Sequence, residues 1–223
     1  MLEITRLKFE YIKGKPLING VSFTVSKGEK VAIYGALNSG KSTICQLIAK
    51  YVKGYDGSIK VCGKEVKSTK IKQLNVLYIG EDLMLSDNQT VLKNAEFALK
   101  TRKFPKNEVE NRAKESLEFC GLKNVANIKA KELDYKQKFL LAFARGIARN
   151  PDLVLIDDVF FGKEKEEELY NLVKQIVLKT PITTVFATSC IGALKDYNLR
   201  TIVLNYGEVG FDGQFLDSVY ANE

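Results

Sequence analysis

The segment GALNSGKST, from Gly35 to Thr43, matches the pattern G-x-x-x-x-G-K-[ST] of a phosphate-binding loop. In such a loop, backbone N–H groups and the N-terminus of the following helix point at phosphate oxygens. The side chain of Lys41 would reach the outer phosphates, and the hydroxyl of Ser42 would hold a magnesium ion. The pattern therefore predicts that the chain binds a nucleoside triphosphate. The residues expected to hold its phosphates are Gly35, Asn38, Ser39, Gly40, Lys41, Ser42 and Thr43.

The residues on both sides of this loop have the secondary-structure signals that phosphate binding needs. EKVAIYG, from Glu29 to Gly35, is a short apolar run typical of a buried strand. STICQLIAKYV, from Ser42 to Val52, has apolar residues at helical spacing. Strand, glycine-rich loop and helix follow one another, as a phosphate site at a helix N-terminus requires.

The remaining chain alternates strands with helices around one polar stretch. Strands are expected in LEITRLKFEYI, PLINGVSFTV, VLYIG, LVLID, TTVFAT and TIVLN, and as a short pair in SIKVCGKEV. Helical spacing over about 83–133, where NAEFALKTR precedes KNEVENRAKESLEFCGL, indicates a helical insertion. Further helices are expected over 136–149 and near 163–179.

This order of elements predicts an α/β fold. We expect a P-loop nucleoside-triphosphatase core with a mixed, mostly parallel sheet, an N-terminal antiparallel β subdomain and an inserted helical subdomain. Residues 1–82 and 136–223 are assigned to the core with its β subdomain, and residues 83–135 to the insertion.

The segment PDLVLIDD, from Pro151 to Asp158, is an apolar strand that ends in two acids, Asp157 and Asp158. A carboxylate at the end of a strand beside a phosphate loop completes a magnesium site, directly or through water. Asp157 fits that role. Asp158 would stand where a base could orient the attacking water.

Composition limits the chemistry more than it selects a partner. The chain has no histidine, so its reaction cannot use an imidazole, and its four cysteines lie far apart without a C-x-x-C pair. The net charge of +7 is spread along the chain and is compatible with a solvated surface, an anionic membrane leaflet or nucleic acid. No apolar run approaches the length of a membrane helix, and no signal peptide precedes the first strand, so we expect a soluble, cytoplasmic protein.

Over essentially its whole length, the chain resembles the ATP-binding subunit of an ABC transporter. Tyr11, in FEYIKGKPLINGVSF, matches the aromatic residue that stacks on adenine in that family, which implies ATP and magnesium as cofactors. EDLMLSDNQTVLKNAEFAL, from Glu81 to Leu99, is similar to the subgroup that serves cell division, lipoprotein release and macrolide export. LDYKQKFLLAFARGIARNPDLVLID resembles the signature helix and the aspartate strand that follows it.

Several positions depart from the family pattern. Asn38 replaces the middle glycine of the loop, a mild change because asparagine tolerates positive φ. Glu81 replaces a glutamine that links magnesium and water to the helical subdomain. Asp158 replaces the catalytic glutamate and is one methylene shorter. Ser189 replaces the histidine that contacts the γ-phosphate, and FFGK at 160–163 replaces S-A-L-D.

The signature itself is changed most. LDYKQ, from Leu133 to Gln137, stands where the family has LSGGQ, a segment that clamps nucleotide bound to the opposite subunit. Tyr135 and Lys136 put side chains where backbone approaches phosphate closely, although Lys136 could add a compensating cation. Asp134 would face phosphate with like charge. Asp134 and Gln137 have the spacing of a helix capping box.

The resemblance implies one set of residues for binding and another for hydrolysis. The magnesium ligands are expected to be Ser42, Asp157 and Glu81, and the catalytic candidates are Asp158, Glu81 and Ser189. The residues that hold nucleotide survive, whereas those that hydrolyse it or clamp a partner's nucleotide are altered.

Three functions are compatible with this pattern. The first is a degenerate ABC-type ATP-binding subunit that binds Mg-ATP with weak or no hydrolysis and couples to a membrane permease near Glu81 to Thr90. The second is an active but slow ABC transporter ATPase that powers transport. The third is a soluble scaffold of the same fold without a transport role. We expect a homodimer, or a heterodimer with another ABC ATPase subunit, at the inner face of the membrane, and no nucleic-acid partner.

Overall fold

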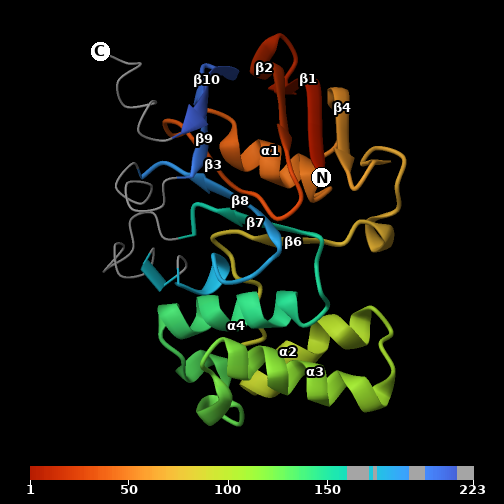
Figure 1. The fold of residues 1–223 in the computed structure, drawn as a ribbon, viewed down its shortest axis with the longest axis vertical. Helices are drawn as coiled ribbons and strands as arrows, with labels where there is room; N and C mark the ends of the chain where they lie inside the picture. Colours follow the sequence, from red (N-terminus) through yellow and green to blue (C-terminus); the bar gives the residue numbers. More distant parts are fainter. Residues whose placement is uncertain (160–170, 173–174, 191–198, 215–223) are drawn as a thin grey trace. The chain divides into compact units, whose positions relative to one another are not determined.

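The structure is a computed structural model that describes residues 1–159, 171–172, 175–190 and 199–214. The chain divides into two compact units (Figure 1). The first is built from residues 1–81 together with those from 152 onward, and the second from residues 82–151. The FFGK segment at 160–163 lies outside the described residues, as does most of the helix expected near 163–179.

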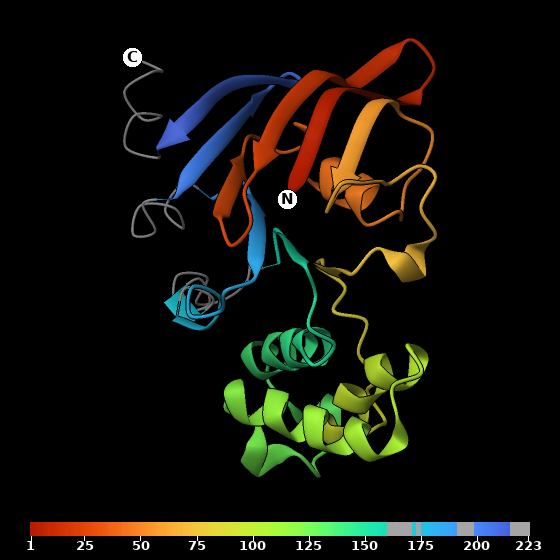
Figure 2. The ribbon, with the colours of Figure 1, turned by 45° about the vertical axis from the view of Figure 1, so that its right-hand side comes forward.

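A four-stranded antiparallel sheet opens the first unit. Its order is β2-β1-β4-β5, and β1 pairs with both β2 and β4 (Figure 2). One face is apolar because alternate residues of β1 and β2 point inward, which confirms the predicted β subdomain. The bounds are β1 Leu2–Ile12, β2 Lys15–Val25, β4 Asp56–Val61 and β5 Lys64–Glu65.

The second sheet of this unit has six strands in the order β10-β9-β3-β8-β7-β6. All neighbours in it are parallel except β9 and β10, which confirms the mixed, mostly parallel sheet. β7 and β8 are buried at every position, as expected for parallel strands covered on both faces. The bounds are β3 Lys30–Tyr34, β6 Val76–Ile79, β7 Leu153–Asp157, β8 Thr183–Thr188, β9 Arg200–Asn205 and β10 Glu208–Gln214.

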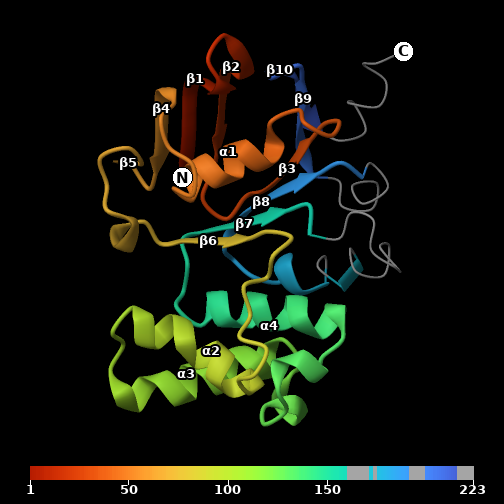
Figure 3. The ribbon, with the colours of Figure 1, turned by 180° about the vertical axis from the view of Figure 1, so that it is seen from behind.

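Helix α1, Lys41–Ile48, lies between the two sheets of the first unit (Figures 1 and 3). Its buried residues Ile44, Leu47 and Ile48 belong to a core cluster that also contains residues of both sheets. The helix ends four residues before the predicted end at Val52. Its C-cap is Ala49, and Lys50 adopts a positive φ of 63°, which ends the helical path.

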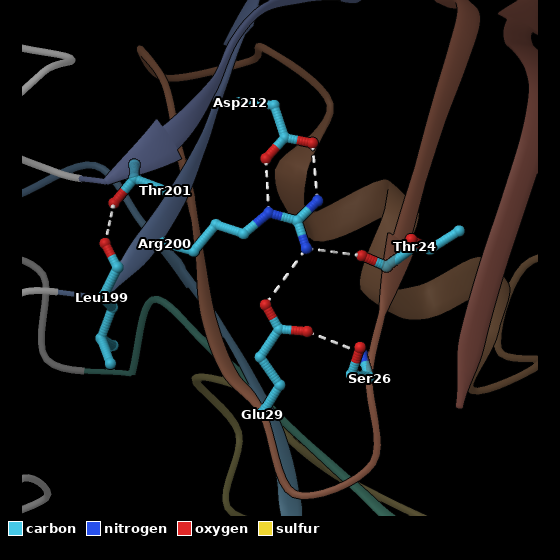
Figure 4. Close-up of polar contacts among 7 residues, drawn as sticks. All are labelled: Thr24, Ser26, Glu29, Leu199, Arg200, Thr201 and Asp212. Atoms are coloured by element: carbon cyan, nitrogen blue, oxygen red, sulfur yellow. Dashed lines mark hydrogen bonds and ion pairs between the residues drawn. The ribbon is translucent and has the colours of Figure 1, made fainter.

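An arginine network fixes the segment that leads into β3 (Figure 4). Arg200 of β9 donates two hydrogen bonds to the carboxylate of Asp212 in β10, at 2.6 and 2.7 Å. Its third nitrogen donates to the carbonyl of Thr24 and to Glu29, whose other oxygen accepts from the N–H of Ser26. Glu29 directly precedes β3, so the network anchors the start of this strand. The phosphate loop follows the opposite end of the same strand.

The second unit is helical. Helices α2, α3 and α4 pack on one another through apolar faces, and the two helices expected in the polar stretch are confirmed as α2 and α3. The expected end of the insertion at residue 135 lies inside this unit, at the start of α4. The bounds are α2 Val91–Thr101, α3 Lys106–Phe119 and α4 Tyr135–Ile147. Short 3-10 helices span Lys123–Val125 and Ala130–Glu132, and another, Ile71–Gln73, belongs to the first unit.

A bulge in β1 leaves no room for a side chain at Gly57 of β4. The register of β1 slips between Ile4 and Leu7 against β2, and Arg6 there has φ 46°. A Cβ at Gly57, where φ is 85°, would collide with the carbonyl oxygens of Thr5 and Arg6. Glycine is therefore required at this crossing by both conformation and space.

We expect Gly57→Ala to lower stability by about 2–5 kcal/mol, the sum of left-handed strain and a backbone collision. Gly14→Ala is the matched control, because Gly14 has φ 81° but open space around its Cβ position. It should cost about 1–2 kcal/mol. Thermal unfolding followed by circular dichroism measures both variants. Equal midpoints for the two would show that the collision with β1 does not exist in solution.

Candidate nucleotide-binding site

The phosphate loop joins the carboxyl end of β3 to α1 and needs glycine at both ends. A Cβ at Gly35 would lie 2.6 Å from the Oγ of Ser39 and 2.7 Å from the carbonyl oxygen of Leu204. Gly40, the N-cap of α1, has φ 99°. Asn38 has φ 62°, a conformation that asparagine adopts more readily than other side chains. Space at Gly35 and conformation at Gly40 therefore both favour glycine.

Lys41 folds back into this loop. Its Nζ donates to the carbonyl oxygens of Gly35 and Ala36, both at 2.9 Å, and contacts the Oγ of Ser39 at 3.4 Å. The residue is 4% exposed. Burial lowers the pKa of Lys41, whereas the nearby carboxylates of Asp158 and Asp157 act in the opposite direction. The ammonium is therefore held where phosphate oxygens could replace the loop carbonyls as acceptors.

Asp157 and Ser42 meet across the site, as expected for magnesium ligands. The Oγ of Ser42 donates to the Oδ1 of Asp157 at 2.8 Å, joining residues 115 apart in the sequence. Asp157 is 5% exposed, and burial raises the pKa of its carboxyl group, an effect that hydrogen bonds from Ser42 and Tyr78 oppose. One hydroxyl and one carboxylate suit magnesium, which takes few protein oxygens and completes its shell with water and phosphate. The donor set fits the ion.

Tyr78 of β6 is a residue of this site that sequence reasoning missed. Its phenol donates to the Oδ2 of Asp157 at 2.8 Å, so both carboxylate oxygens have a donor. Burial and the negative charge of Asp157 raise the pKa of Tyr78 well above its usual range, which keeps the phenol protonated. In the sequence, Tyr78 looks like an ordinary aromatic strand residue. Only its position on the strand beside β7 indicates a contact.

Asp158 turns away from Asp157 toward the end of β8. Its φ of 46° is left-handed, and its backbone N–H donates to the carbonyl of Ala187. The Oγ of Ser189 donates to Oδ2 of Asp158 at 2.8 Å. The N–H of Ser189 and the Oγ1 of Thr188 lie 3.3 and 3.5 Å from Oδ1. The structure thus brings together two of the three expected catalytic candidates, Asp158 and Ser189.

Glu81, the third candidate, follows β6 and is exposed. Since β6 and β7 are parallel neighbours with Ile79 opposite Ile156, Glu81 and Asp157 lie at the same edge of the sheet. Its role toward magnesium stays a prediction.

Tyr11 lies beside the start of α1. Its hydroxyl is 3.3 Å from the Oγ1 of Thr43, and its ring packs edge-on against Phe9 with centroids 4.7 Å apart. The residue remains 60% exposed. An exposed ring next to the phosphate-loop helix is suited to stack on a base, as expected from the sequence.

The altered signature segment belongs to the second unit and caps α4. The side chain of Asp134 accepts from the N–H of Gln137 at 2.7 Å, and the Gln137 side chain accepts from the N–H of Asp134 at 3.2 Å. This is the capping box expected from the spacing. Tyr135 is half-buried and Lys136 exposed. Asp134 thus has a structural role that does not depend on nucleotide.

The segment before α2 in this unit is held by two side chains. Asn94, which is buried, accepts from the N–H of Ser86 and donates to the carbonyls of Ser86 and Thr90. Arg145 donates to the carbonyls of Leu83 and Met84. The chain from residue 83 to residue 90 is therefore an ordered feature of the second unit.

These features together define a P-loop nucleotide-binding protein: a glycine-rich loop between a parallel strand and a helix, with a carboxylate on a neighbouring strand. A family model described as "ABC transporter" matches residues 18–160. The chain belongs to the ABC transporter family.

Individual relatives agree with this assignment. The methionine import ATP-binding protein MetN 2 of Bacillus cereus is 30% identical over 207 residues, which cover 90% of this chain but only 61% of that protein. Among solved structures, CbiO1 of Clostridium perfringens, part of the ABC transporter complex CbiONQ, aligns with TM-score 0.87 and 22% identity over 100% of this chain and 91% of its own. A dimeric ATP-binding cassette bound to ADP and Pi aligns with TM-score 0.80 and 24% identity, covering 96% and 99%.

These comparisons confirm the predicted family and fold. The subgroup suggested by Glu81 to Leu99 stays a prediction. Among the described residues, no helix is long and apolar enough to cross a membrane.

We expect Asp134→Ala to destabilise the second unit by about 1 kcal/mol, because it removes the side-chain acceptor of the α4 cap. Asp134→Asn is the matched control, since asparagine caps about as well as aspartate. Urea unfolding followed by circular dichroism measures both. Equal stability of the alanine and asparagine variants would contradict a structural role for the cap.

Proposed function

We propose that this chain is an ATP-binding subunit that binds Mg-ATP with weak or no hydrolysis and couples to a membrane permease. The observation that carries the proposal is the contrast between the two adjacent acids. Asp157 faces the hydroxyl of the phosphate-loop residue Ser42, whereas Asp158 is held by Ser189 at the end of β8. The first arrangement supports metal binding, and the second disfavours a free catalytic base.

Nucleotide binding is supported by three neighbouring elements. The loop from Gly35 to Gly40 has left-handed backbone at Asn38 and Gly40, and the ammonium of Lys41 donates to its carbonyls. Loops of this kind at a helix N-terminus bind phosphate through backbone N–H groups. Ser42 and Asp157 fit magnesium, which would neutralise phosphate charge and orient the outer phosphates when bound. Tyr11 offers an exposed ring beside the same helix. We take the nucleotide to be ATP because the relative MetN 2 is an ATP-binding protein.

Weak hydrolysis is supported by the environment of Asp158. Its carboxylate faces three donors from Thr188 and Ser189, which fix it toward β8. An aspartate is also one methylene shorter than the family's glutamate, and a displacement of about 1 Å can cost on the order of 100-fold in rate. The hydroxyl of Ser189 donates its hydrogen bond to Asp158, so in this arrangement it does not donate to phosphate. Positioning and electrostatic stabilisation supply nearly all of the catalysis of phosphoryl transfer. Changes that misplace the base and remove a donor to phosphate should therefore slow hydrolysis.

The partner proposal rests on the relatives and on the second unit. CbiO1 is part of a transporter complex, and one structural neighbour is a dimer. By analogy, the chain would pair with a copy of itself or with another ATP-binding subunit. A permease would dock near Glu81 to Thr90, where Met84 is 53% exposed on a segment that Asn94 and Arg145 hold in place. In this reading the protein lies at the cytoplasmic face of a membrane.

We expect Lys41→Ala to lower the affinity for Mg-ATP by about 10- to 100-fold, because charge-assisted hydrogen bonds contribute about 1.5–3 kcal/mol each. Lys30→Ala is the control: Lys30 also donates to backbone carbonyls, at Gly28, Thr180 and Ile182, but lies at the opposite end of β3. Fluorescence titration with a labelled ATP analogue measures both. Unchanged affinity in Lys41→Ala would refute nucleotide binding at this loop.

We expect Asp158→Asn to change steady-state turnover by less than about threefold, since a carboxylate fixed on Ser189 contributes little as a base. The turnover of the Lys41→Ala variant is subtracted as background, because any phosphate released by that variant does not come from this site. Phosphate release from purified protein with Mg-ATP is the measurement. A Lys41-dependent rate that falls 100-fold in Asp158→Asn would identify Asp158 as a working base and the chain as a slow but active ATPase.

A further inference from the structure

The carboxylate of Asp157 has two oxygens, and each has its own hydroxyl donor. Ser42 of α1 reaches Oδ1 and Tyr78 of β6 reaches Oδ2, both at 2.8 Å. Rotation about the terminal torsion of an aspartate has broad, two-fold minima, so a single donor leaves the carboxylate plane loosely defined. Two donors on opposite oxygens define it.

Tyr78 has neighbours on α1, in the segment after α1 and directly after β6. Its ring packs on that of Tyr51, with centroids 5.2 Å apart, and the side chain of Gln46 on α1 acts on the pKa of the phenol. The ring also folds over Gly80, where a Cβ would lie 2.7 Å from the phenol oxygen and 2.9 Å from Cε1. The phenol therefore occupies space that would be filled by a side chain at any residue other than glycine at position 80.

We propose that Tyr78 is a positioning residue for a divalent cation held by Ser42 and Asp157. This inference rests on the proposed Mg-ATP binding. Tyr78 does not touch the nucleotide loop in the described contacts; it acts by holding Asp157 in the orientation that faces Ser42. Partners that orient a metal ligand through its second oxygen typically change metal affinity by 10- to 100-fold when removed.

The test is Tyr78→Phe, which removes one hydroxyl and keeps the packed ring. Affinity for a fluorescent ATP analogue is measured in EDTA and over a Mg²⁺ titration, and Mn²⁺ binding to the protein–nucleotide complex is followed by electron paramagnetic resonance. We expect the apparent affinity for either cation to fall about 10-fold, with nucleotide affinity in EDTA unchanged within twofold.

Tyr55→Phe is the matched control. Tyr55, which is buried, likewise directs its phenol at a carboxylate, that of Glu65, at 3.4 Å. Glu65 belongs to β5 of the antiparallel sheet and Tyr55 directly precedes β4, so neither residue is part of the proposed cation site. It should leave the cation affinity at the wild-type value. Gly80→Ala is a second test variant, since its methyl group displaces the phenol without removing it. It should weaken cation binding as Tyr78→Phe does.

Two outcomes would overturn the inference. One is wild-type Mg²⁺ and Mn²⁺ affinity in Tyr78→Phe. The other is an equal loss of nucleotide affinity with and without cation, which would mean that the phenol supports the loop in general. A wild-type protein that binds no nucleotide in either condition would instead refute the proposed function, so the two failures are distinguishable.

Discussion

The hydrogen bond between Ser42 and Asp157 is the interaction around which the first unit is arranged. At 2.8 Å it joins the N-terminus of α1 to the carboxyl end of β7. It forms only if α1 lies over the parallel sheet and if β7 lies two strands from β3. Both conditions follow from apolar burial: α1 covers β7 and β8, and those strands are buried throughout. The Ser42–Asp157 hydrogen bond is modest in energy, and it forms only when the apolar core has packed α1 against the parallel sheet.

Parallel strands explain why residues from distant parts of the chain meet at this place. Side chains that follow parallel strands lie at one edge of the sheet, and ligands bind there. The order β3-β8-β7-β6 puts the phosphate loop, Ser189, the two acids and Glu81 along that edge in turn. Residues at the ends of neighbouring strands can therefore change without any change in the loop proposed to bind phosphate. Substitutions at 158 and 189 alter one part of the edge and leave Ser42 and Asp157 intact.

Much of this was predictable because the decisive signals are local. The phosphate loop, its strand and its helix are contiguous, and the capping box at Asp134 and Gln137 is a four-residue pattern. β10 is not predicted, because Gly210 and Gly213 weaken the strand signal of its sequence and it pairs only with β9, at the edge of the sheet. The contact of Tyr78 with Asp157 was missed for a related reason. It depends on strand order, which no short segment of sequence encodes.

At the two adjacent acids, Asp157 and Asp158, one backbone conformation separates two sets of contacts. In a regular strand, successive side chains point to opposite faces, and the next residue would continue that alternation. Here φ of 46° at Asp158 ends the strand just after Asp157. Asp157 remains between α1 and β6, held by Ser42 and Tyr78, while Asp158 reaches β8 and Ser189. The serine at 189 and the shorter acid at 158 form one hydrogen-bonded pair, so a change at either position alters the surroundings of the other. The residues proposed to bind the cation share no described hydrogen bond with that pair. The proposed loss of hydrolysis would therefore involve positions 158 and 189 and leave the contacts of Ser42 and Asp157 unchanged.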